Sequence, residues 1–201
     1  MNHSDSDSGM DHTRVNNGSL APQAWPSLGA EFSSLQRHPM TVRDLDAVVS
    51  IEVRAYSHPW SHGNFVDSLA VAYRAEVWRV DAVAVPGGHQ PLVGYFVAMP
   101  GVDELHLLNI TVAPEWQGRG VGHALLDAVQ AHAREQSLAT LWLEVRESNH
   151  RARALYRRRG FSEVALRRGY YPGGPVAGRR EDAVVMSLPV AATDSPRVIE
   201  N

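Results

Sequence analysis

The chain has 201 residues of ordinary composition, a formal net charge of −3 and no cysteine. This length suits one domain with tails, and the lack of cysteine excludes a disulfide framework, a thiolate nucleophile and a cysteine-ligated metal site. The sequence has no run of about 18 apolar residues that would span a membrane. Its acidic start lacks the basic and apolar regions of a secretory signal. We therefore expect a cytoplasmic protein with no membrane contact.

Charge is unevenly distributed along the chain. Four of the 22 acidic residues but only one of the 19 basic residues fall within residues 1–36, which leaves 18 of each in the remainder. A globular part that is neutral overall argues against direct binding of nucleic acid, which requires a basic field. Ten of the basic residues, all arginine, lie between Arg146 and Arg180, where a solvated helix face is the simplest interpretation.

Three segments differ in composition. Residues 1–36 are rich in Ser, Asp, Asn, Gly and Pro and are predicted to form a flexible tail. Residues 37–190 are predicted to form one domain, and residues 191–201 a polar C-terminal tail. Met40 opens the part with clear periodicity, so a true start at this residue is an alternative.

Apolar periodicity predicts strands and helices in alternation within the domain. A short strand from Pro39 onward precedes a first helix, whose predicted apolar face is Leu45, Val48, Val49 and Val53. Ser61 is placed to cap a second helix. Further strands are expected at 76–85, 92–100, 104–114, 139–145, 162–171 and 182–190, and further helices at 123–136 and 149–159. The strand at 139–145 is nearly all apolar, which predicts that both of its faces are covered. This pattern is typical of an α/β fold.

The stretch Gln117-Gly118-Arg119-Gly120-Val121-Gly122 joins an expected strand to an expected helix. Backbone N–H groups at such a helix start favour a bound phosphate. The mononucleotide loop requires a lysine, which this chain lacks, and the dinucleotide fingerprint requires a glycine where His123 stands. A plain turn between a strand and a helix remains an alternative.

Gln117, Gly120 and Gly122 match the acyl-CoA pyrophosphate loop Q/R-x-x-G-x-G/A, so this stretch resembles the GCN5-related N-acetyltransferase (GNAT) family. The segments HPWS at 58–61, LWLEVRESN at 141–149, ALY at 154–156 and REDA at 180–183 resemble the ribosomal-protein-alanine N-acetyltransferases of that superfamily. The resemblance implies the GNAT fold, a mixed and mostly antiparallel sheet of about seven strands flanked by about four helices.

The resemblance also implies acetyl-CoA as cosubstrate and assigns its binding residues. These are Ile110, Thr111, Val112, Gln117, Gly118, Arg119, Gly120, Val121, Gly122, His123 and Asn149. It implies Glu144 as general base and Tyr156 as general acid. We expect Pro59, Trp60, Tyr170 and Tyr171 to hold the peptide substrate, although they would equally serve to close the core.

Strand and helix periodicity offers independent expectations for the catalytic pair. Glu144 shares a strand face with Trp142, where burial would tune a carboxylate toward general-base chemistry. A solvated residue paired with Arg146 is the alternative. Asn149 suits a helix N-cap, and Tyr156 lies seven residues on, so both fall near one helix face. Capping alone for Asn149 and core packing for Tyr156 are the alternatives.

The expected reaction is direct transfer of the acetyl group to the N-terminal α-amine of a protein. The resemblance implies the N-terminal alanine of a small-subunit ribosomal protein as substrate. Two alternatives remain: acetylation of lysine or a small amine, and a non-catalytic acyl-CoA sensor. His58 and His62 are four residues apart, but Pro59 disfavours one helix across both and no third ligand has a suitable spacing, so no metal is expected.

Overall fold

The structure is a computed structural model that describes residues 35–81, 90–173 and 178–190. Most of the two predicted tails, part of the predicted strand at 76–85 and part of the loop after Tyr171 lie outside these residues. Among the described residues, no helix is long and apolar enough to cross a membrane.

A seven-stranded sheet forms the centre of the described chain, in the order β1-β2-β3-β4-β5-β7-β6. The strands β4 and β5 pair in parallel, and every other neighbouring pair in this sheet is antiparallel. The strands are β1 (Leu35–Pro39), β2 (Arg74–Val80), β3 (Leu92–Pro100), β4 (Glu104–Val112), β5 (Thr140–Arg146), β6 (Ser162–Tyr171) and β7 (Glu181–Pro189). This confirms the predicted mixed, mostly antiparallel sheet.

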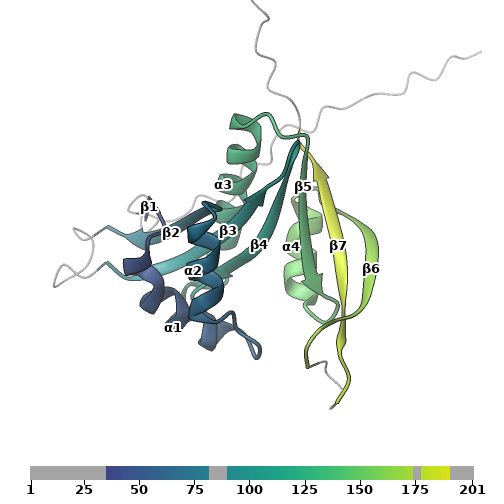
Figure 1. Cartoon of the computed structure of the whole chain (residues 1–201), viewed down its shortest axis with the longest axis horizontal. Coiled ribbons are helices and arrows are strands. Elements are labelled where there is room, and N and C mark those ends of the chain that lie inside the picture. The colour runs from purple at the N-terminus through teal and green to yellow at the C-terminus, as the bar shows by residue number, and fades with distance from the viewer. Residues whose placement is uncertain (1–34, 82–89, 174–177, 191–201) are drawn as a thin grey trace, which may run out of the picture.

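The described α-helices cover the two faces of the sheet, with α1 and α2 on one face and α3 and α4 on the other (Figure 1). They are α1 (Leu45–Ala55), α2 (His62–Ala70), α3 (Val121–Glu135) and α4 (His150–Arg158). Each face has its own hydrophobic core. Under α1 and α2, Phe65 of α2 packs edge-on against Tyr95 of β3. Under α3 and α4, Leu125 of α3 is fully buried. The α1 and α2 pair covers β2 to β4 and leaves the same face of β5, β7 and β6 uncovered (Figure 1).

The predicted helix ends are confirmed by their caps. The Ser61 side chain accepts a hydrogen bond from the Asn64 N–H at 3.3 Å, and the Asn149 side chain accepts one from the Ala152 N–H at 3.1 Å. Gly160 follows α4 with φ of 89°, a conformation that favours glycine. These short polar residues fix where α2 and α4 begin and where α4 ends.

The prediction for the first strand and helix was wrong in two respects. The strand β1 precedes Met40 and includes Leu35 and Gln36, and a short 3₁₀ helix at Val42–Asp44 follows it. Val53 is 55% exposed, because the buried face of α1 runs through Leu45, Val48, Ile51 and Glu52. Adjacent residues of a helix point about 100° apart, so a buried face centred on Glu52 leaves Val53 toward solvent.

The prediction that both faces of β5 are covered was also wrong. Leu141, Leu143 and Val145 are buried under α3 and α4, as alternation predicts. Trp142 and Glu144 are only half-buried on the opposite face, because α1 and α2 do not extend over it.

A β-bulge in β4 creates the opening in which the site lies. Val97 pairs with Asn109 but Ala98 pairs with Leu107, so Leu108 is an extra residue on β4. The parallel pairing of β4 with β5 runs from Glu104 to Leu107 and stops there. Beyond the bulge the two strands diverge, as the lower half of Figure 1 shows. The facing edges of β4 and β5 therefore carry backbone groups without a partner strand.

Candidate active site

Two cavities meet where β4 and β5 diverge. One has a volume of about 630 Å³ and is lined by α1, the segment before α2, β4, β5 and the end of β6. The other has a volume of about 450 Å³ and is lined by the end of β4, the glycine stretch and α4. We call them the amine-side cavity and the loop-side cavity. Tyr56, Ile110 and Asn149 line both.

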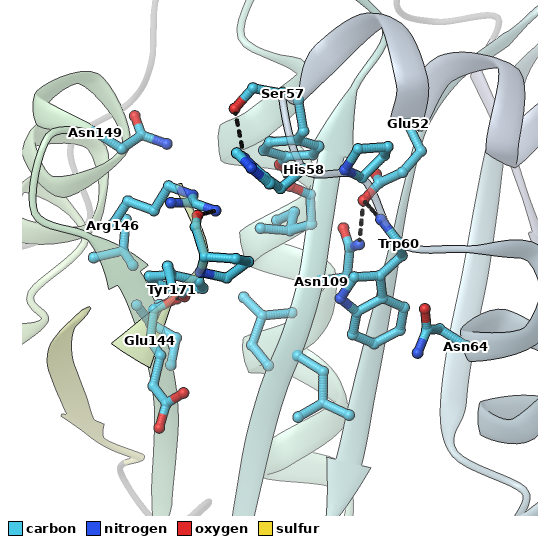
Figure 2. A pocket seen from close by; sticks show the side chains of 18 of the residues that line it. Glu52, Ser57, His58, Trp60, Asn64, Asn109, Glu144, Arg146, Asn149 and Tyr171 are labelled. Carbon is cyan, nitrogen blue, oxygen red and sulfur yellow. Dashed lines mark hydrogen bonds between the residues drawn. The ribbon is translucent and has the colours of Figure 1, made fainter. Parts of the chain in front are cut away.

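Two walls of polar side chains face each other across the amine-side cavity (Figure 2). Glu52, Trp60 and Asn109 stand on one wall, and Glu144, Arg146 and Tyr171 stand on the other. The structure thus brings together several residues that the sequence predicted as site residues, namely Pro59, Trp60, Glu144, Asn149, Tyr156 and Tyr171.

Glu144 differs from its predicted environment. Its side chain is 24% exposed and forms an ion pair with Arg167 of β6 at 2.6 Å, so it is neither fully desolvated against Trp142 nor paired with Arg146. Its carboxylate lies at the opposite end of its wall from Asn149 (Figure 2). A carboxylate at this rim is accessible to solvent and to a cation that enters the cavity.

Arg146 instead organises the wall on which Glu144 lies. Its guanidinium donates to Glu181 at 3.0 Å and to the Pro172 carbonyl at 3.2 Å, and it lies 4.5 Å from the centre of the Tyr171 ring. Glu181 also accepts the Ser148 N–H at 2.7 Å, one residue before the Asn149 cap. Sequence reasoning missed this network, because Glu181 is distant from Arg146 along the chain.

Tyr156 is buried, with 7% of its surface exposed, and packs against Phe161 with ring centres 5.7 Å apart. It also lines the amine-side cavity, so core packing and a place in the site are compatible. Burial, with smaller contributions from Tyr56 and Tyr171, raises the pKa of Tyr156 well above its usual range. The hydroxyl therefore keeps its proton at neutral pH.

The four residues predicted to hold a peptide divide into two groups. Pro59, Trp60 and Tyr171 line the amine-side cavity. Tyr170 does not line the cavity but contacts Glu144, which does. It is 41% exposed, the Arg167 guanidinium lies 5.5 Å from its ring centre, and a hydrogen bond with the Glu144 carboxylate, followed by burial, raises the pKa of Tyr170. His58 adds an unpredicted contact across the cavity, because a Cβ on Gly173 would overlap its ring.

The glycine stretch forms one side of the loop-side cavity. Gly118 and Gly120 have φ of 80° and 91°, so a side chain at either position would be strained. Gly120 caps α3, and its carbonyl accepts the first bond of the helix from the His123 N–H at 3.0 Å. The N–H groups of Val121 and Gly122 thus belong to the unpaired first turn, the usual site for an anion.

The side chains of this region differ in how they relate to the cavity. Ile110, Thr111, Val112, Gln117 and His123 line it, together with Gly118, Gly120, Gly122 and Asn149. Val121 is buried in the core and offers only its backbone, and the Arg119 guanidinium lies 5.1 Å from the centre of the Trp116 ring.

Positive charge surrounds the loop-side cavity. Arg151 and Arg158 line it, and Arg151 donates to Gln117 at 3.0 Å. Gln117 in turn donates to the Val112 carbonyl at 3.2 Å, which ties α4 to the end of β4. Burial, followed by the charges of Arg159 and Arg158, lowers the pKa of His123. A positive field of this kind favours phosphate.

Metal ligands do not gather in the described part of the chain. Within residues 35–81, 90–173 and 178–190 there is no group of three or more His, Asp or Glu side chains placed to hold a metal ion.

Two buried tyrosines predict a loss of stability at alkaline pH. Tyr95 is fully buried, and burial raises its pKa and that of Tyr156 well above 10.0. Above pH 10 the unfolded chain loses these protons while the folded chain retains them. The free energy of unfolding should therefore fall by up to about 1.4 kcal/mol per pH unit for each tyrosine. Urea unfolding at pH 8, 10 and 11 measures this, and equal stability at pH 8 and pH 11 would contradict it.

Comparison with known proteins gives the same family by sequence and by structure. Residues 45–161 match the acetyltransferase (GNAT) family. The [ribosomal protein bS18]-alanine N-acetyltransferase of Escherichia coli K12 is 37% identical over 148 residues, 74% of this chain and 93% of the relative. That of Haemophilus influenzae is 36% identical, over 72% and 91%. The crystal structure of the E. coli ribosomal-protein-S18-alanine N-acetyltransferase superposes with a TM-score of 0.68 at 33% identity, over 83% of this chain and 99% of that chain.

Proposed function

Because the chain belongs to the acetyltransferase (GNAT) family, we propose that it transfers the acetyl group of acetyl-CoA to the N-terminal α-amine of a ribosomal protein, with alanine as the first residue. The observation that carries this proposal is the pair of cavities meeting at Tyr56, Ile110 and Asn149, which gives two substrates separate entrances to one point. A ribosomal protein substrate would place the reaction in the cytoplasm.

The loop-side cavity fits acetyl-CoA, which supplies the activated thioester when bound. The N–H groups at the start of α3 and the positive charge of Arg151 and Arg158 suit the pyrophosphate. We assign the binding of acetyl-CoA to three sets of groups. They are the backbone of Gly118 to Gly122, the side chains of Gln117, His123 and Asn149, and the edge of β4 at Ile110 to Val112. The carbonyls of Ile110 and Val112 already accept bonds from Tyr56 and Gln117, so the edge has fewer free acceptors than a bare strand.

Gly122 tests whether the fold or the bound acetyl-CoA leaves room for a side chain at the start of α3. Its φ is not positive, and an added Cβ would lie 3.4 Å from Leu155 and 3.7 Å from Val112, which the chain tolerates. We expect Gly122→Ala to retain or slightly raise the melting temperature, because alanine favours a helix by up to about 1 kcal/mol. It should leave the Kd of acetyl-CoA nearly unchanged, because the loop pattern Q/R-x-x-G-x-G/A accepts alanine at this position and the added Cβ has room. Calorimetric titration with acetyl-CoA measures this, and a Kd weakened by about tenfold or more, about 1.4 kcal/mol, would show instead that the ligand requires a bare Cα at Gly122.

The chemistry assigned to the chain is one direct transfer. The neutral amine nitrogen bonds to the acetyl carbon, the carbon–sulfur bond breaks, and the amine loses a proton. Glu144 accepts that proton, directly or through water, and Tyr156 donates a hydrogen bond to the departing sulfur. No acyl-cysteine intermediate is available, because the chain has no cysteine.

An α-amine makes a smaller demand on this site than a lysine does. With a pKa of about 7.8, roughly one α-amine in seven is neutral at pH 7, whereas a lysine near 10.4 is neutral about four times in ten thousand. The free energy of deprotonation is therefore about 3.5 kcal/mol lower for the α-amine than for lysine. A carboxylate that is partly exposed and ion-paired, as Glu144 is, suits the easier of the two tasks.

A library of peptides with varied first residues, read by mass spectrometry after incubation with acetyl-CoA, tests this function. We expect acetylation to be fastest with alanine and to fall as the first side chain grows beyond what Pro59, Trp60 and Tyr171 enclose. Equal rates for all first residues would contradict recognition of alanine. Binding of acetyl-CoA without transfer to any peptide or small amine would favour an acyl-CoA sensor.

A further inference from the structure

A buried carboxylate that the proposed mechanism does not use lies at the centre of the α1 side of the site. Glu52 is 1% exposed, although it lies on the apolar face of α1. Its oxygens accept the backbone N–H of Trp60 at 3.0 Å and the Asn109 side-chain amide at 3.1 Å. They also accept the hydroxyl of Tyr95. Three donors satisfy the charge, so this carboxylate is a fixed acceptor.

This network joins the two parts of the chain that form the α1 side of both cavities. Trp60 belongs to the segment between α1 and α2, which lines the amine-side cavity. Asn109 and Thr111 belong to β4 beyond the bulge, where their side chains face α1. Glu52 therefore holds the peptide-side segment against the strand that borders the loop-side cavity.

Thr111 lies between the Glu52 carboxylate and the Tyr56 hydroxyl, at the meeting point of the cavities. Its Oγ1 is 2.9 Å from Asn109 Oδ1, 3.2 Å from the Tyr56 oxygen and 3.3 Å from Glu52, and its one proton can serve one of these acceptors at a time. The Tyr56 hydroxyl donates to the Ile110 carbonyl at 3.0 Å. Because its proton is directed to Ile110, the Tyr56 oxygen can act only as an acceptor toward a further group. Of the three residues that line both cavities, Tyr56 alone carries a hydroxyl.

We propose that the Tyr56 oxygen accepts a hydrogen bond from the attacking amine at the junction of the two cavities, and that Glu52 is a positioning residue. Through Trp60 and Asn109 it holds the segment that carries Tyr56 against β4. This rests on the proposed amine acetylation and adds a residue to its site. An ammonium or amine N–H is a donor, and an oxygen whose own proton is already placed suits it without rotating. Burial, the largest influence, raises the pKa of Tyr56 to about 12, so the group stays neutral through the physiological range.

Tyr56→Phe and Glu52→Gln test the two roles, with Tyr73→Phe and Glu76→Gln as matched controls. Glu76 is also buried, 3% exposed, but lies on β2 and is paired with Arg37 and Arg74. Tyr73 lies beside β2, among the residues of a different surface pocket. We expect Tyr56→Phe to lower kcat for an alanine-started peptide about 10- to 100-fold, the effect of losing one hydrogen bond to a charged or charging group. The Kd of acetyl-CoA and the shape of the pH–rate profile should stay as in the wild type.

Coupling between the variants tests the positioning role. Glu52→Gln should lower kcat at least fivefold alone but less than twofold in the Tyr56→Phe background, because both changes disturb one contact with the amine. Both controls should keep kcat within twofold. If Glu52→Gln does not fold, Asn109→Ala removes one of the donors that hold Glu52 against β4 and carries the same expectations.

Two results would overturn the inference: wild-type kcat in Tyr56→Phe, or fully multiplicative losses in the double variant. Failure of the wild-type protein to acetylate any α-amine would instead refute the proposed function. These two failures are distinguishable, because the first requires a wild-type enzyme that turns over.

Discussion

Glu144→Gln is expected to lower kcat/KM for an alanine-started peptide by about 10²- to 10⁴-fold at pH 7, the usual contribution of a positioned general base. The amide keeps the shape of the side chain but cannot accept the amine proton. Because Glu144 lies on the amine side and not among the residues of the loop-side cavity, the Kd of acetyl-CoA should be unchanged. Steady-state kinetics at saturating acetyl-CoA, with a separate binding titration, measure both quantities.

Glu163→Gln is the matched control for this variant. Glu163 is also partly exposed, 33% for its side chain, and is also paired with arginines, but it lies on β6 against α4 and outside both cavities. It should keep kcat/KM within about twofold. Arg167→Gln removes the partner of Glu144 and leaves the carboxylate in place, so its loss should be smaller than that of Glu144→Gln. Wild-type turnover by Glu144→Gln would refute the general-base role.

Tyr156→Phe is expected to lower kcat by about 10²-fold and to leave the KM of the peptide nearly unchanged, because the contact with sulfur develops only as the carbon–sulfur bond breaks. The raised pKa of Tyr156 gives this prediction a pH signature. Since the folded protein retains this proton beyond pH 10, ionisation of Tyr156 should produce no loss of wild-type kcat below that pH.

The kinetic pattern of Tyr156→Phe distinguishes catalysis from packing. Loss of a buried hydroxyl costs little stability when the ring remains packed on Phe161, so the variant should melt within a few degrees of the wild type. A raised peptide KM with normal kcat would assign Tyr156 to binding, and unchanged kinetics would leave it a core residue only.

Much of the fold follows from local patterns in the sequence. The caps at Ser61, Asn149 and Gly160 and the alternation of β5 are set by neighbouring residues, and the structure confirms them. Errors arose where burial depends on a distant element. The exposure of Trp142 and Glu144 follows from where α1 and α2 end, which periodicity along β5 cannot show.

The site shows the same division. The glycine stretch and the Asn149–Tyr156 spacing identified one helix start and one helix face. The partners of Glu144 and Arg146 could not be predicted, because Arg167 and Glu181 reach them only through strand pairing. The spacing of Glu52 could have been used but was not. Glu52 follows Leu45 by seven residues and Val48 by four, which places a carboxylate on the apolar face of α1. An acid in that position has to be satisfied by the fold or used by the site.

The central claim, acetyl transfer to a protein α-amine, is tested most directly with two peptides of one sequence. One has a free N-terminal alanine and a blocked lysine side chain, and the other has a blocked α-amine and a free lysine. Each is incubated with the protein and acetyl-CoA and weighed intact by mass spectrometry. The account predicts a gain of one acetyl group on the first peptide and none on the second. Acetylation of the second peptide alone, or of neither, would contradict it.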